Sequence, residues 1–269
     1  MARSRSLTTC RPRHPGPKIN IQTAFKILSD CPLHVRMQPE DSVQPAALPD
    51  AMLLAATGGL LDAVVFLLHG HVFANSMTGN VVFLGIAMLG RDWADIVPHL
   101  VPLAGFFLGV LTSKHLRARL GVRSVLLGLA LEIVTIFTLG WLPGSFPHMA
   151  FSGIIAYVAA FQVASFRRVD RFAYNSTFMT GNLRDVAEGF YEALTSTSTA
   201  ETREKGLSQA RDLGLICLCF LLGAVLGAWS APRFANYSLW LAEPFLLAVA
   251  VIAFRRRTAP IAQPPSHSH

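Results

Sequence analysis

The chain has 269 residues, of which 52% are hydrophobic and only 14% are charged, and its mean hydropathy is +0.44. So few charged side chains cannot give a chain of this length a water-facing surface, which excludes an ordinary water-soluble domain. The formal net charge of +7 does not indicate nucleic-acid binding, because the basic residues cluster at the ends of apolar stretches. The composition predicts an integral membrane protein whose main partner is the lipid bilayer.

The first 48 residues differ from the rest of the chain. They are rich in Arg, Pro and Ser and lack an apolar stretch long enough for a signal peptide. We expect a disordered basic tail over residues 1–48, although an organelle transit peptide and a translation start at Met37 are alternatives. A second disordered tail, rich in Pro, Ser and His, is expected over residues 256–269.

Residues 49–255 form the predicted membrane domain. Their apolar windows are almost free of charge; between Asp50 and Arg91, for example, Asp62 is the single charged residue. A helix needs about 20 mostly apolar residues to cross the hydrocarbon core. The ten-residue alternation of a membrane β-barrel is missing, so the fold class is all-α. We predict about six full transmembrane helices, near residues 50–70, 97–117, 122–142, 147–166, 212–231 and 237–254.

A short polar motif occurs twice in this domain. Met-Thr-Gly-Asn stands at residues 77–80 and again at 179–182, each time shortly after an apolar span, and the glycine-containing stretch 106–110 is echoed at 220–224. Two matches in the same order predict a duplication. We place repeat one at residues 49–142 and repeat two at residues 147–255.

Two segments carry a family resemblance. Residues 58–66 read Gly-Gly-Leu-Leu-Asp-Ala-Val-Val-Phe and precede the first motif, and Phe161-Gln162-Val163-Ala164 precedes the second. With these segments the chain resembles the YoaK-like bacterial membrane proteins, a widespread group of unknown function, over roughly residues 50–255. The resemblance implies a multi-pass protein of the bacterial inner membrane and supplies no substrate. At Val163 the family's pattern leads us to expect an amide side chain instead.

Basic residues predict the orientation, because short cytoplasmic loops are rich in Lys and Arg. The loop after the second full span, the end of the fourth span and the C-terminus are all basic. These three basic segments lie on the same side of the membrane only if the motif segments, near 76–90 and 177–195, do not cross it. Each half then crosses three times, which predicts inverted repeats with both termini in the cytoplasm. The competing topology has eight spans.

The motif segments are predicted to be two shorter, re-entrant helices. Residues 77–90 are too short for a span, and 178–195 carry four charged side chains. One interpretation is a turn and helix cap that were merely duplicated. In the other, the two helix starts meet near the membrane midplane and attract a polar or anionic solute. The candidate solute ligands are Thr78, Asn80, Thr180 and Asn182.

Three acids lie inside predicted spans: Asp62, Glu132 and Glu243. An intramembrane carboxyl group costs about 2–4 kcal/mol to insert on translocon scales, so it normally faces a partner or a hydrated cavity. The three acids are therefore candidates for a proton or cation pathway, with hydrogen bonding between helices as the alternative. Asp62, one turn after Gly58 and Gly59, is predicted to be the most consequential of them.

These observations favour a transporter or channel for a small polar or anionic solute. The alternatives are a structural or regulatory membrane protein and, less favoured, a membrane enzyme built on Asp62, His69 and His71. We expect no enzyme, because no HExxH, GxSxG or nucleotide-binding glycine loop occurs. Neither a cofactor nor a metal is expected, since the cysteines show no ligand spacing. The sequence does not indicate an oligomeric state.

Overall fold

The computed structural model describes residues 47–258, apart from 92, 122, 167, 170, 171, 174–178 and 196–198. The predicted tails, except for residues 47, 48 and 256–258, lie outside the described residues. The helices, in chain order, are α2 (Leu48–Leu68), α3 (Met77–Gly90), α4 (Trp93–Leu120), α5 (Arg123–Gly140), α6 (His148–Ser165), α7 (Met179–Leu194), α8 (Ala200–Phe234), the 3-10 helix η2 (Ala235–Ala242) and α9 (Glu243–Thr258). A minimal hairpin, β1 (Arg168–Val169) and β2 (Phe172–Ala173), follows α6.

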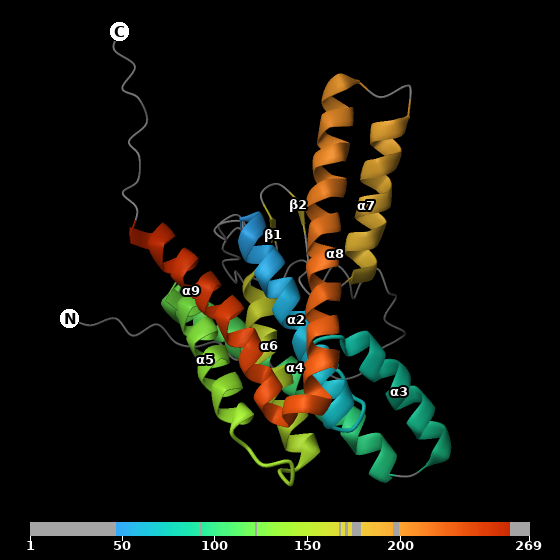
Figure 1. Cartoon of the computed structure of the whole chain (residues 1–269), viewed down its shortest axis with the longest axis vertical. Coiled ribbons are helices and arrows are strands. Elements are labelled where there is room, and N and C mark those ends of the chain that lie inside the picture. Colours follow the sequence, from blue (N-terminus) through green and yellow to red (C-terminus); the bar gives the residue numbers. More distant parts are fainter. Residues whose placement is uncertain are drawn as a thin grey trace, which may run out of the picture. The chain divides into compact units, whose positions relative to one another are not determined.

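The all-α membrane fold class is confirmed. Helices α2, α4, α5 and α6 and the stretch Ala200–Arg256 are long and apolar enough to cross a membrane. That last stretch contains two helices: α8 descends to η2 in Figure 1, and α9 rises from it. α9 has 16 residues and η2 adds 8. The stretch therefore contains the last two of the six predicted spans.

α8 is longer than predicted. It begins at Ala200, whereas the predicted span begins at residue 212, and the Thr199 hydroxyl caps it by accepting a hydrogen bond from the Thr202 amide (3.2 Å). Its first turns are rich in Ala, Glu, Lys, Arg and Gln, which are strong helix formers in water. The helix can therefore continue beyond the apolar span.

The long helices pack in two pairs, α2 along α8 and α4 along α6. Glycines allow the backbones to approach closely. A Cβ atom at Gly59 would overlap the Phe220 carbonyl of α8, and one at Gly223 would overlap the Ala56 carbonyl of α2. In the second pair, a Cβ atom at Gly109 would overlap the Tyr157 carbonyl. Small residues have this role in helix contacts within membranes, where apolar burial gives little driving force.

The two motif helices have different surroundings. α3 has 14 residues and exposes apolar side chains such as Ile86 and Leu89. α7 instead packs on the polar first part of α8, where Gly189 and Gly206 lie against each other's backbone. Neither helix is among the candidate spans. That the motif segments do not cross the membrane stays a prediction.

All four tryptophans of the chain lie at helix ends or connections. Trp93 begins α4, Trp141 follows α5, Trp229 lies near the end of α8 and Trp240 belongs to η2. Trp141 and Trp240 are in edge contact, with ring centroids 5.0 Å apart. These ends of α4, α5 and α8 lie together at the bottom of Figure 1. Tryptophan prefers the lipid headgroup region, so this face is at a membrane surface.

Candidate functional site

Asp62 anchors the segment that joins α2 to the first motif. Its side chain is 4% exposed, and its carboxylate accepts hydrogen bonds from the Asn75 amide (2.7 Å) and the Ser76 hydroxyl (2.5 Å). The Asn75 side-chain amide donates in turn to the Gly58 carbonyl (3.4 Å). The connection thus folds back onto α2, and the carboxyl group holds it there.

The Asn80 side chain hydrogen-bonds back to the same connection at Phe73. Its Oδ1 accepts from the Phe73 amide and its Nδ2 donates to the Phe73 carbonyl, both at 2.8 Å. Gly79 lets the Phe73 ring approach closely, because a Cβ atom at Gly79 would lie 2.6 Å from that ring and would force it to shift. Thr78, by contrast, is exposed. In the first motif, the asparagine therefore stabilises the turn, and the threonine is the side chain available to a solute.

The second motif has the same pattern of exposure. Asn182 in the first turn of α7 is 3% exposed, while Thr180 is exposed. One turn later, Val186 packs against the apolar cluster that α2 and α8 form at Ala51, Ala55, Leu213 and Ile216. Residues 174–178, which precede this motif, lie outside the described part of the chain.

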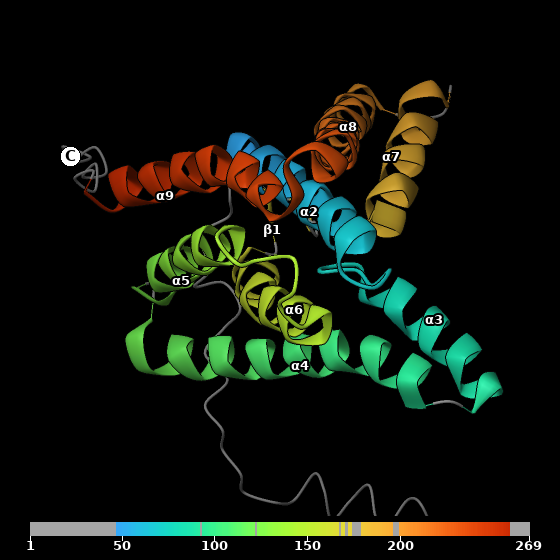
Figure 2. The ribbon, with the colours of Figure 1, turned by 60° about the horizontal axis from the view of Figure 1, so that its bottom comes forward.

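The two motif helices begin close to each other. Asn75 of the first connection contacts α2 at Gly58, while Val186 of α7 packs against the apolar cluster that α2 shares with α8. The first turns of α3 and α7 are neighbours in both Figure 1 and Figure 2, and the two helices point away from each other. That they form a shared solute site stays a prediction.

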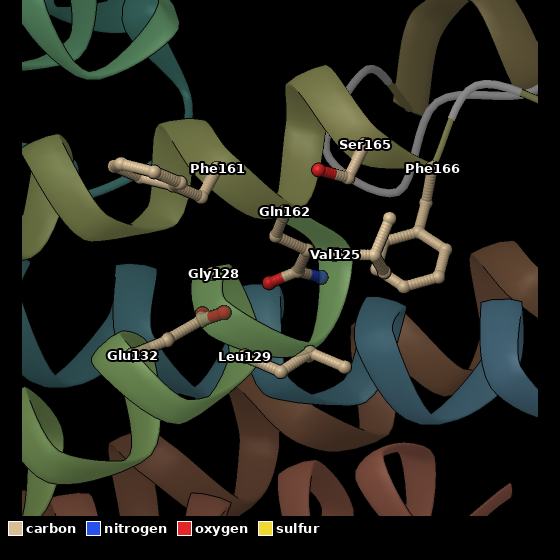
Figure 3. Close-up of a pocket in the computed structure, with 8 residues that line it drawn as sticks. All are labelled: Val125, Gly128, Leu129, Glu132, Phe161, Gln162, Ser165 and Phe166. Carbon is tan, nitrogen blue, oxygen red and sulfur yellow. The ribbon is translucent and has the colours of Figure 1, made fainter. Parts of the chain in front are cut away.

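Glu132 lies in the interior between α5 and α6. Its side chain is fully buried, and neither carboxyl oxygen has a hydrogen-bond partner among the described residues. A narrow pocket surrounds it, as Figure 3 shows. Apart from Glu132, the pocket is lined by Val125, Gly128, Leu129, Phe161, Gln162, Ser165 and Phe166.

Gln162 is a polar pocket residue that was not among the predicted site residues. Its Nε2 donates to the Leu54 carbonyl of α2 (3.0 Å), while its Oε1 has no partner within the described structure. Figure 3 shows the Gln162 side-chain amide and the Glu132 carboxyl group extending toward each other from facing helices. An amide within an otherwise apolar span was the signal that could have identified it.

Glu243, at the start of α9, is half-buried, and its Oε1 also lacks a partner among the described residues. Its carboxyl group lies near enough to that of Glu132 for the two charges to repel each other. The structure therefore brings together two of the three predicted acids. The third, Asp62, belongs to the motif connection.

His69, at the end of α2, joins a buried polar network. Its Nε2 donates to Asn236 Oδ1 (2.9 Å), and the Asn236 amide donates to the Leu142 carbonyl (2.9 Å). His69 Nδ1 is then left to accept from His148 Nδ1, 3.2 Å away. Burial, together with the nearby His148, lowers the pKa of His69 to about 4, although the Asn236 hydrogen bond acts in the opposite direction. This network ties α2 to α6 and η2.

The fold and these buried groups define a multi-pass α-helical protein of the cell membrane with polar side chains inside its bundle. The chain belongs to the family described as a protein of unknown function (DUF1275), whose model matches residues 51–252. It is 26% identical over 208 residues to the UPF0700 transmembrane protein YoaK of Bacillus subtilis (strain 168), covering 75% of this chain and 91% of that protein. The resemblance to YoaK-like proteins is thereby confirmed. No solved structure matches the chain.

Proposed function

We propose that this protein is a transporter or channel for a small polar or anionic solute, built from two inverted repeats, and not an enzyme. The observation that carries the proposal is the reciprocal packing of the halves. Each half begins with a long helix, α2 or α6, and has another long helix after its motif, α4 or α8. The first helix of one half packs along the post-motif helix of the other half, so that α2 packs along α8 and α6 packs along α4. Likewise α5 packs on α6, and α9 packs on α2.

This exchange of partners is what a two-fold axis in the membrane plane produces. Such an axis relates α3 to α7, and it explains why two helices with the same motif begin close together and point away from each other. Exposed backbone N–H groups and the positive ends of two helix dipoles favour a negative charge between them. The exposed Thr78 and Thr180 hydroxyls would add donors at the same place.

The test is flux in proteoliposomes. Purified protein is reconstituted and supplied with a panel of inorganic anions, small organic acids, amino acids and neutral polyols, with and without a pH gradient. We expect uptake of at least one solute above that of protein-free liposomes. The double variant Thr78→Cys, Thr180→Cys, joined by a short bis-maleimide, should lose this uptake, whereas each single variant treated in the same way should keep it.

A structural or regulatory membrane protein is the second candidate. One observation favours it: Asp62 and Asn80 form these hydrogen bonds with the connection between α2 and α3. On this alternative, no member of the panel is taken up, and the Asp62 and Asn80 variants change only the amount of folded protein.

A further inference from the structure

The environment of Glu132 cannot support an ionised carboxylate. The side chain is 0% exposed and both oxygens lack hydrogen-bond donors within the described chain. Taking a carboxylate out of water costs several kcal/mol unless a cation or strong donors replace the lost hydration. The pocket lining contains no basic residue, and the space between its side chains is too narrow for a water molecule.

The charged surroundings lead to the same conclusion. Of the acids and bases on the helices that pack against α5, Glu243 of α9 is the one that acts on Glu132 in the described structure, and it has the same sign. α6 presents Gln162 and Ser165 to the pocket, and neither can neutralise a carboxylate. A neutral, protonated Glu132 is the form that fits this site.

A protonated carboxyl group needs an acceptor for its O–H, and the pocket holds one. Gln162 Oε1 has no partner among the described residues, and the bond from Gln162 Nε2 to the Leu54 carbonyl fixes which end of the amide faces the pocket. Figure 3 places the two side chains opposite each other. An O–H donated from Glu132 to Gln162 Oε1 would satisfy both groups.

We propose that Glu132 is a proton-binding site, with Gln162 as the positioning residue that accepts its O–H, and that this proton is the coupling ion of the transporter. The coupling role rests on the proposed function; the bound proton does not. Glu132 belongs to the first predicted repeat and Gln162 to the second, so the proton is held where the halves meet. A relative movement of the halves would expose Glu132 to water and release the proton.

The bound proton is tested by infrared spectroscopy of the full-length protein in lipid bilayers at pH 7, where exposed carboxyl groups are ionised. We expect a C=O stretching band of a protonated carboxyl group that is lost in Glu132→Gln. It should stay in the matched control Glu243→Gln. In Gln162→Leu, which removes the acceptor, the band should move to higher frequency. A merely structural glutamine would not cause that shift.

Glu132→Asp keeps a carboxyl group at this position, so it tests the proposal even if Glu132→Gln does not fold. Its protonated-carboxyl band should appear at a different frequency from that of the wild type. The absence of a protonated band in the wild type, or an unchanged band in Glu132→Gln, overturns the proposal. The coupling role is tested separately, by measuring transport. If a solute is taken up, Glu132→Gln should lose the effect of the pH gradient but keep exchange of the solute, and a retained pH effect overturns the coupling role. A Glu132 band without any solute flux refutes the proposed function and leaves the proton site standing.

Discussion

Arg256, near the end of α9, donates a hydrogen bond to Asp50, in the first turn of α2, over 2.7 Å. The Asp50 side chain is 4% exposed and that of Arg256 is 38% exposed. This ion pair joins the beginning of the first membrane helix to the end of the last one. The chain therefore enters and leaves the membrane domain on the same side, which requires an even number of crossings. The basic C-terminal residues predict that this side is cytoplasmic.

Cysteine labelling should reveal this topology. In a background without the native cysteines, single cysteines at Arg91, Pro143 and Arg233 should react with a membrane-impermeant maleimide in intact cells. A cysteine at Arg119 should react only after permeabilisation, because basic residues keep that end of α4 inside. Labelling of position 119 from outside would contradict six crossings with cytoplasmic termini.

Replacing Asp62 should separate a structural role from a proton relay. Asn in its place can still accept from the Asn75 amide and can donate to the Ser76 hydroxyl, whereas Ala leaves both donors unpaired. We expect Asp62→Ala to lower the free energy of unfolding by about 1–3 kcal/mol. Asp62→Asn should stay close to the wild type.

Thermal stability in detergent and membrane abundance measure this effect. If the Asn variant is folded as well as the wild type but loses proton-coupled flux, Asp62 has a relay role that its hydrogen bonds do not explain.

Close packing of α2 on α8 should make Gly223 intolerant of a methyl group. A Cβ atom there would collide with the Ala56 backbone, so Gly223→Ala should destabilise the protein by about 1–3 kcal/mol. Gly214→Ala is the matched control on the same helix, since a Cβ atom at Gly214 would have no neighbour within 4 Å. The control should be neutral or slightly stabilising. Equal melting temperatures for the two variants would contradict the helix pairing.

Acidification should weaken the His69 network. Unfolded His69 titrates near pH 6.5, while its folded pKa is about 4, so between these values the unfolded chain binds more protons. The contribution of His69 to stability should therefore level off above pH 6.5 and fall by about 3 kcal/mol toward pH 4. His69→Gln should flatten this part of the melting profile, whereas the exposed His71, changed to Gln, should not. An identical profile in all three proteins would refute the effect.

Much of the fold was predictable from hydropathy. Lipid requires each span to satisfy its own backbone hydrogen bonds, so apolar windows marked α2, α4, α5 and α6 to within a few residues. The start of α8 was the clearest difference, because its first turns are polar and are stabilised by helix propensity and by packing on α7. Hydropathy does not report either effect.

The candidate site was only partly predictable. Asp62, Glu132 and Glu243 were recognised as candidates because charge is expensive in an apolar span. The sequence did not reveal how their surroundings differ. Asp62 accepts hydrogen bonds from the connection that follows its own helix, whereas Glu132 faces the side-chain amide of Gln162 on α6. Gln162 received no role because an uncharged amide gives a weak signal in a hydropathy pattern.

The membrane location, the helical class, the order of the spans and the duplicated motif can all be read from the sequence, because each of them follows from local composition and spacing. The pairing of the helices, the hydrogen bonding of the carboxyl groups and the facing positions of Glu132 and Gln162 become visible only in the packed structure. These are relations between residues far apart in the chain. Their energies depend on distance and on exclusion of water, and both exist only once the helices have packed.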